Sequence, residues 1–382
     1  MLGSLSLDPS AHVFMDLFDM LEETAVMEDP RGWLAGLPMV GQVAVLSHVH
    51  ASARAPCTRH RGMCHVPMAD MDCTGTPCQD WSPLGRQLGV DGPHMPILLA
   101  WCSAIAARAV PIVVHENVPQ FPVELLHGLL GHAYYIVPII VDCSDLGFRL
   151  IRRTRRYTLM FHKARAVVVH NPADVYELMC ARIACTCPAT RVQDCWLADG
   201  LELMEELSPL CHRRGLPMSS VLHVSHDNTH AHVRGMRLLL THGELMRLNA
   251  YEHRWLQAYG HHACTNPDAV FNLGDNPMSG HCTWSGTSGS LPGLRTGAQK
   301  YWVPYLGRWL TCKELLACMG LPVYPSLAIA AGVPMVHVKP GRQARHMLGN
   351  MMHAASIGAM QMLALSCARP MISADLALAI AA

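Results

Sequence analysis

Two residues of this sequence stand at the ends of predicted strands, where reactive side chains often lie. Cys78 follows Pro77 in a turn after the segment 68–74. A cysteine held outside the regular backbone ladder suits an exposed nucleophile. Glu116 follows the apolar run 111–115, at the kind of strand end where α/β sheets gather ligands. Taken singly, an inert buried thiol and a solvated loop carboxylate are the simpler interpretations.

A cluster of arginines forms the third chemically informative segment. Four guanidinium groups fall within five positions just ahead of a predicted strand at 157–161, namely Arg152, Arg153, Arg155 and Arg156. Guanidinium groups bind phosphates and carbonyls through several donors at once. For any one of these arginines, a charged strand edge that discourages pairing is the plainer interpretation.

The elements that would position these residues follow an alternating strand and helix pattern, which predicts an α/β domain with a mostly parallel sheet. Pro96 opens a predicted helix at 96–108, and Pro138 either confines the strand predicted at 134–141 to an edge or splits it. The remaining expected elements are helices at 11–30, near 311 and at 341–367, and strands at 41–48, 111–115, 157–161 and 166–170. Between 185 and 300 the pattern is irregular.

The composition excludes some classes of protein and leaves others open. Lys+Arg and Asp+Glu cancel at 29 each, whereas proteins that bind nucleic acid without sequence preference usually carry a basic excess. A local basic patch remains compatible with this balance. The 16 cysteines show no framework spacing, which favours free thiols in a reducing compartment. The longest apolar run, 96–115, contains Arg108 and Pro111 and does not read as a membrane span.

Together, the order and rough spacing of these segments resemble the cytosine-5 DNA methyltransferase family. The family motifs Pro-Cys-Gln-x-x-Ser, Glu-Asn-Val and Gln-x-Arg-x-Arg are matched by residues 77–82, 116–118 and 151–155, with Ile151 in place of the Gln. Residues 308–314 look like the family's Arg-x-Leu-Thr-x-x-Glu motif. Gly349 and Asn350, expected to open a helix, look like the start of its last motif.

The resemblance implies a role for each matching residue. Cys78 would add to C6 of cytosine, Glu116 would donate to N3, and Arg155, supported by Arg153, would hold O2. S-adenosylmethionine would then methylate C5. The remaining implied site residues are Pro77, Gln79, Ser82 and Asn117 for substrate positioning and Gly349 and Asn350 for the cofactor. The implied partner is DNA with its target base flipped out, and a nuclear location follows from that substrate alone.

The same resemblance implies a Rossmann-like class I methyltransferase sheet with a smaller, irregular target-recognition domain. Residues 1–165 would form most of the catalytic α/β domain, 166–300 the target-recognition region, and 301–382 a segment that returns to the catalytic domain. The family's first strand and its Phe-x-Gly-x-Gly turn are not found before Cys78. The sheet would therefore be incomplete at its N-terminus or diverged there, or the donor would not bind.

Two alternatives stay open beside an active DNA methyltransferase. A chain without donor binding would be an inactive, methyltransferase-like nucleic-acid-binding module. An RNA cytosine-5 methyltransferase would use the same chemistry on a loop cytosine, where flipping costs less.

A loop rich in cysteine and histidine raises the separate question of a metal. Cys57, His60, Cys64 and His65 are ligand types for zinc. Adjacent Cys64 and His65 fit one tetrahedral ion poorly, and 24 histidines make chance clusters common. We therefore assign no metal ligands from the sequence.

Overall fold

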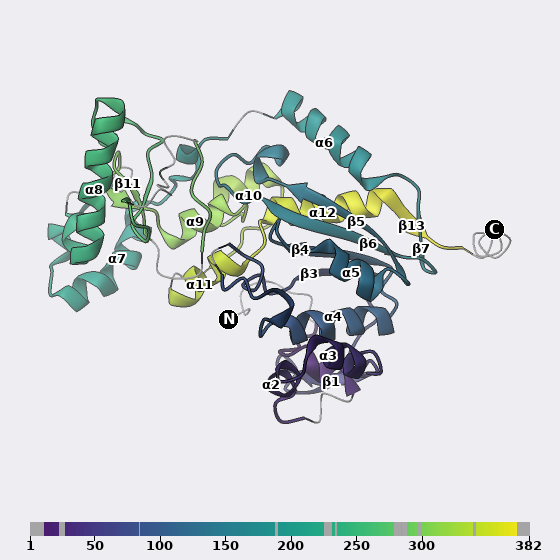
Figure 1. Cartoon of the computed structure of the whole chain (residues 1–382). Coiled ribbons are helices and arrows are strands. Elements are labelled where there is room, and N and C mark those ends of the chain that lie inside the picture. Colours follow the sequence, from purple (N-terminus) through teal and green to yellow (C-terminus); the bar gives the residue numbers. More distant parts are fainter. Residues whose placement is uncertain are drawn as a thin grey trace. The chain divides into compact units, whose positions relative to one another are not determined.

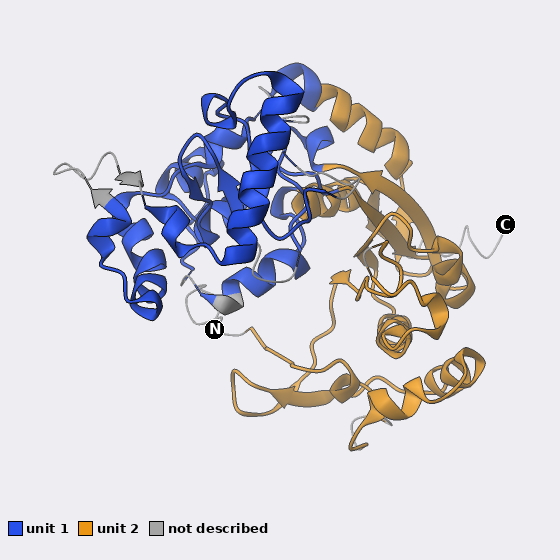
Figure 2. Cartoon of the chain, turned by 60° about the vertical axis from the view of Figure 1, so that its left-hand side comes forward, with its two compact units in different colours: residues 1–5, 143–153, 183–355 blue, residues 6–142, 154–182, 356–382 orange. Residues whose placement is uncertain are grey.

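The computed structural model describes residues 11–22, 27–83, 85–187, 190–224, 231–233, 235–278, 284, 289–295, 300–338 and 341–372. The chain divides into two compact units (Figure 2). Unit 1 comprises residues 1–5, 143–153 and 183–355, and unit 2 comprises 6–142, 154–182 and 356–382. Within the described residues, no helix has both the length and the apolar character needed to cross a membrane.

The centre of unit 2 is a four-stranded sheet with the order β3 (Met71–Gly75), β4 (Ile112–Asn117), β6 (Arg155–His162) and β5 (Tyr134–Val141) (Figure 1). β3 and β4 are parallel, and β6 runs antiparallel to both β4 and β5. Three strands therefore share one direction and β6 opposes them. The α/β prediction is confirmed as a mixed sheet rather than a nearly parallel one.

Helices pack on this sheet and form the hydrophobic core with it. α4 (Met95–Ala107) connects β3 to β4 and buries most of its length, and α5 (Val123–Leu130) connects β4 to β5. β4 is buried at every position, as expected for a strand covered on both faces. α12 (Ala354–Cys367) lies against β3, where Gln361 Nε2 contacts Cys73 Sγ at 3.0 Å.

Several strands of unit 2 agree with the sequence prediction. β5 has the predicted bounds and is the outer strand next to β6, a place that tolerates Pro138 because an edge strand leaves some N–H positions unpaired. The next strand, β7 (Ala166–Val168), pairs with β13 (Ala368–Pro370), so the C-terminal segment lies beside β7. α6 (Pro172–Thr186) then runs from unit 2 into unit 1.

The N-terminal part of unit 2 contradicts two predictions. Within the described part of 11–30 there is only a 3-10 turn, η1 (Phe18–Met20), before α2 (Pro30–Ala35), and residues 23–26 lie outside the described residues. The strand predicted at 41–48 is a helix, α3 (Met39–Leu46), because its short apolar run packs on α4. A hairpin of β1 (Arg54–Cys57) and β2 (Gly62–His65) follows.

Unit 1 is more regular than predicted for residues 185–300. It contains η3 (Cys143–Leu146), η4 (Val192–Cys195), α7 (Gly200–Arg214), η5 (Met218–Ser220), β8 (Leu222–Val224), β9 (Ala231–Val233), η6 (Met236–Leu239), α8 (His242–Tyr259) and η7 (Ala263–Thr265). A small sheet follows, made of β10 (Phe271–Asn272), β11 (Tyr301–Val303) and β12 (Arg308–Trp309). The unit ends with α9 (Cys312–Cys318), α10 (Pro325–Ala331) and α11 (Arg342–Asn350).

Candidate functional site

One edge of the unit 2 sheet brings together three of the segments singled out from the sequence. Gly75 at the end of β3 pairs with Glu116 near the end of β4, and Asn117 pairs with Arg156 at the start of β6. Cys78 stands three residues beyond Gly75 and is partly exposed. The loop of Cys78, the end of β4 and the start of β6 therefore share this edge.

Glu116 and Arg155 form an ion pair at this edge. Arg155 Nε lies 3.0 Å from Glu116 Oε1, and the two side chains are 22% and 11% exposed. The pair is not aligned as a hydrogen bond, and among the described residues Oε1 accepts none. Arg155 also donates from Nη1 to the Thr154 carbonyl at 2.8 Å. A carboxyl group and a guanidinium group thus stand side by side, largely shielded from solvent.

A buried hydrogen-bond network fixes the start of the Cys78 loop to the end of β4. Asn117 Nδ2 donates to Thr76 Oγ1 at 3.0 Å, and His115 Nε2 lies 2.7 Å from the same hydroxyl. Asn117 Oδ1 accepts from Val118 N–H at 2.8 Å. Thr76 and His115 were not singled out from the sequence, although each directly precedes a segment that was.

Within the loop, a tight turn holds Cys78 in place. Its carbonyl accepts from Trp81 N–H at 3.0 Å and Ser82 N–H at 2.8 Å. Gly85 closes the loop against Gln79, where a Cβ would lie 1.9 Å from the Gln79 carbonyl oxygen. Ser82 thus orders the loop through its backbone, and no side chain larger than hydrogen fits at position 85.

Asp80 anchors the far side of the same loop. Its buried carboxylate accepts from His94 N–H at 3.0 Å and lies 3.1 Å from His94 Nδ1. Gly92 packs directly on this carboxylate, since a Cβ there would lie 2.1 Å from Asp80 Cγ. The loop is therefore built around its own polar contacts and is not a loose connection.

Acid is expected to destabilise unit 2 through His115, which is fully buried and stacked on Trp101 at 4.8 Å. Burial lowers the pKa of His115 to about 3, against about 6.5 in an unfolded chain. Between these two values only the unfolded state binds the proton. The unfolding free energy should therefore fall by up to about 1.4 kcal/mol per pH unit as the pH drops below about 6.5. Urea unfolding at several pH values measures this slope. His115→Gln should flatten it, and an unchanged slope would contradict the assignment.

Arg153 and the two predicted cofactor residues belong to unit 1. The buried Arg153 guanidinium donates from Nη2 to the Met351 carbonyl at 2.5 Å. Gly349 and Asn350 close α11 and do not open a helix, which corrects the prediction, and α12 begins only at Ala354. Asn350 Nδ2 lies 3.5 Å from His346 Nε2 one turn earlier.

The described residues do not fit S-adenosylmethionine in the way the resemblance implies. Ahead of β3 the chain forms η1, α2, α3 and the β1–β2 hairpin, with no strand that leads through a glycine turn into a helix within 11–22 and 27–70. A glycine turn is what lets backbone N–H groups approach such a cofactor. Asn350 sits at a helix C-terminus, where its contact is local.

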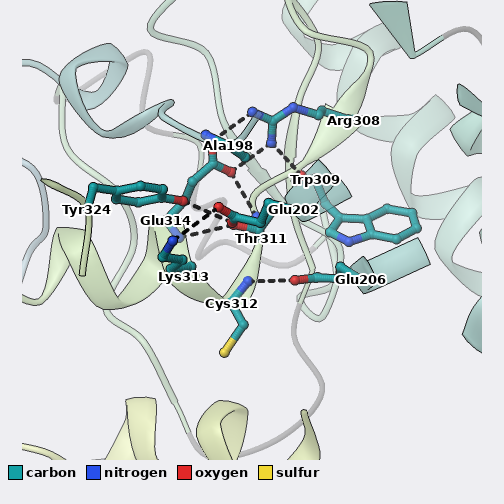
Figure 3. A network of polar contacts seen from close by, with 10 residues as sticks. All are labelled: Ala198, Glu202, Glu206, Arg308, Trp309, Thr311, Cys312, Lys313, Glu314 and Tyr324. Atoms are coloured by element: carbon teal, nitrogen blue, oxygen red, sulfur yellow. Dashed lines mark hydrogen bonds and ion pairs between the residues drawn. The ribbon is translucent and has the colours of Figure 1, made fainter. Parts of the chain in front are cut away.

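The motif at 308–314 has a structural task in unit 1 (Figure 3). Arg308 and Glu314 form a buried bidentate pair with both N–O distances at 2.7 Å. Thr311 and Glu314 complete a capping box at the start of α9, with Glu314 Oε2 accepting from Thr311 N–H at 2.8 Å. Thr311 also donates to Glu202 Oε1, which accepts from the Tyr324 hydroxyl at 2.9 Å. The network ties α7, α9 and β12 into one core.

Comparisons with known proteins find similarity among solved structures at low identity. No protein-family model matches it, and no curated protein does. Similar solved structures include the Dnmt2 methyltransferase of S. pombe, with 12% identity and a TM-score of 0.39 over 86% of this chain and 81% of that one. The methyltransferase EhMeth of Entamoeba histolytica gives 11% and 0.39 over 78% and 77%. A putative DNA modification methyltransferase of an E. coli prophage gives 15% and 0.41 over 78% and 79%. At these identities and scores the similarity assigns no activity.

Proposed function

We propose that this chain is a DNA cytosine-5 methyltransferase whose nucleophile is Cys78. The observation that carries the proposal is the Glu116–Arg155 pair, 3.0 Å apart at the sheet edge where the Cys78 loop begins. Three segments far apart in the sequence supply a thiol, a carboxyl and a guanidinium group to one edge of one unit. Each of the three matches the residue type that the motif resemblance assigns to it.

The proposed chemistry begins with the Cys78 thiolate, which bonds to C6 of a flipped cytosine and breaks the C5–C6 double bond. The Glu116 carboxyl group donates a hydrogen bond or a proton at N3 as the thiolate adds, so that negative charge does not build up on the ring. Arg155 binds O2 through its guanidinium and orients the base. The resulting enamine is nucleophilic at C5. A bound donor would supply a methyl group to C5. C5 would then lose its proton to a base, the C5–C6 double bond would re-form, and the C6–S bond would break to release the Cys78 thiolate.

The methyl donor implied by the resemblance is S-adenosylmethionine. A second candidate function, a nucleic-acid-binding module without methyl transfer, is favoured by one observation. The described residues ahead of β3 contain no strand with a glycine turn. The two candidates differ in donor binding, which is directly measurable.

Isothermal titration of the purified full chain with S-adenosylmethionine is expected to give micromolar binding if the chain is a methyltransferase. The matched assay incubates the chain with oligonucleotides that carry 5-fluorocytosine, as DNA and as RNA, with and without the donor. Fluorine cannot leave C5 as a proton does, so methyl transfer leaves a covalent complex that survives denaturation. A donor-dependent complex with DNA supports the proposal, and one with RNA alone reassigns the substrate.

A probe that needs no donor separates the remaining outcomes. 5-Azacytosine accepts a thiolate at C6 without methyl transfer, so it reports the nucleophile alone. Trapping by 5-azacytosine without donor binding would support the nucleic-acid-binding module. Absence of both donor binding and trapping would overturn the proposed function.

A further inference from the structure

Four side chains of unit 2 outside the proposed catalytic edge gather in one small volume. They are His12, Cys57, His60 and Cys64, and one ligand atom from each lies within 4.8 Å of the corresponding atom of every other. His60 Nδ1 is 3.5 Å from Cys57 Sγ and 3.3 Å from Cys64 Sγ. Two sulfur and two nitrogen ligand atoms are thus gathered in one place.

The two separations between His60 and the cysteines agree with the nitrogen–sulfur edge of a tetrahedral zinc site, and the other pairs lie within 4.8 Å. With Zn–S near 2.3 Å and Zn–N near 2.0–2.1 Å, the nitrogen–sulfur edge of a tetrahedron is about 3.5 Å. Paired thiolate and imidazole ligands are a set that favours zinc among the common divalent ions. Four protein ligands would leave no open position, which is the arrangement of a structural site and not of a catalytic one.

The β1–β2 hairpin explains how the cysteines come to one side. In its register Ala55 pairs with Cys64 and Cys57 pairs with Gly62, so Cys57 and Cys64 lie diagonally on the same face. His60 is in the turn between the strands. His65 follows Cys64 and therefore points to the opposite face, where it is exposed. Cys64 is therefore the ligand and His65 is not, so one ion does not need two ligands that are adjacent in the sequence.

The fourth ligand arrives from the segment ahead of η1, which is pinned to the hairpin. Val13 N–H donates to Cys57 Sγ at 3.3 Å, and the Val13 carbonyl accepts from Thr58 N–H at 2.9 Å. Phe14 forms a β-bridge with Cys57. An N–H that donates to the sulfur is a common outer partner of a metal-bound thiolate. His12 is thus held over the hairpin by backbone contacts on its C-terminal side.

We propose that His12, Cys57, His60 and Cys64 bind one zinc ion as a closed structural site. The ion would fasten the segment at 11–14 to the hairpin, and it would add binding free energy to the folding of this part of unit 2. Among residues 11–14 and 54–65, all of them described, only Ala55 and Cys57 are buried, so a metal would replace missing core. The site is independent of the proposed methyl transfer, and its failure would leave that proposal standing.

Metal analysis of the full chain, purified without chelator, is expected to give one zinc per chain. Cys64→Ser and His12→Gln should each abolish this stoichiometric zinc, and His65→Gln, which alters the neighbouring exposed histidine, should retain it. Replacement of zinc by Co²⁺ should give the intense visible bands of four-coordinate cobalt together with a thiolate charge-transfer band. Circular dichroism of each variant reports whether it is folded.

If the variants do not fold, experiments on the wild-type chain alone still test the proposed zinc site. Removal of zinc by a chelator should make two further thiols reactive toward a disulfide reagent, and added zinc should protect them again. Several results would overturn the proposal: no zinc uptake by the chain in the presence of free zinc, a six-coordinate cobalt spectrum, equal zinc loss in His65→Gln, or a Cys57–Cys64 disulfide in the freshly purified protein.

Discussion

Replacing Cys78 by alanine is expected to abolish the covalent complex with 5-azacytosine DNA and to lower methyl transfer by on the order of 10⁴-fold or more. The reason is that no other side chain at this sheet edge offers a thiolate from the loop that follows β3. The Cys78 carbonyl holds the turn through Trp81 and Ser82, and alanine retains this carbonyl. The variant should therefore keep its fold and lose its chemistry. Electrophoresis under denaturing conditions detects the complex.

The matched control for this variant is Cys73→Ser. Cys73 is an exposed cysteine of β3 whose Sγ contacts Gln361 of α12, away from the Glu116 edge. Its replacement should leave trapping unchanged. Glu116→Gln should give an intermediate loss of roughly 10²–10⁴-fold, the usual contribution of a general acid. Trapping that persists in Cys78→Ala, or that disappears equally in Cys73→Ser, would contradict the assignment of the nucleophile.

The parts of the site that could be predicted from the sequence are those set by strand order. β4 is an apolar, β-branched run whose length and flanks identify a buried strand, so the position of Glu116 at its end followed directly. The position of Cys78 followed from the turn residues after β3. The ion pair between Glu116 and Arg155 could not be derived in this way, because it depends on β6 inserting antiparallel beside β4. Strand order within a sheet is a property of the whole fold.

The helices of unit 1 carry clear sequence signals at their ends. α8 begins with a capping box between Thr241 and Glu244 and ends at Gly260 with φ 72°. Its buried residues Leu248, Tyr251 and Trp255 follow helical spacing. The apolar stripe that these residues form is narrow. The many histidines around it hide the helical pattern in the composition of the segment. In this region the cap residues predict the helix better than the composition does.

The cluster around His12 could not be found from spacing. His12 precedes the nearest cysteine ligand by more than 40 residues, and only the backbone contacts of Val13 bring it to the hairpin. The strand predicted at 41–48, where the structure has helix α3, was wrong for a different reason. A run of this length fits a strand or a helix equally well until it is known what packs on it, and α4 supplies that partner only in the folded chain.

Glu314→Gln is expected to lower the unfolding free energy of unit 1 by about 3–5 kcal/mol. Arg308 is 5% exposed and Glu314 is fully buried, so the substitution leaves a buried guanidinium without its counter-charge. Both carboxylate oxygens of Glu314 also accept hydrogen bonds from backbone N–H groups, at Thr311 and Ala198. Urea unfolding followed through the fluorescence of the buried tryptophans of this unit measures the change.

Two further variants separate charge imbalance from lost packing. Lys313→Gln alters the neighbouring residue, whose ammonium group lies 3.8 Å from Glu202 and is partly exposed, and it should cost less than about 1 kcal/mol. Arg308→Met combined with Glu314→Leu removes both charges and should recover part of the loss, because buried ion pairs gain little over well-packed apolar groups. A loss in Glu314→Gln no greater than in Lys313→Gln would contradict a structural role for the pair. A full loss with no recovery would assign the stability to the helix cap and not to the charges. A large loss in Glu314→Gln, with or without recovery in the double variant, would indicate that the resemblance of 308–314 to a family motif reflects how α9 is built.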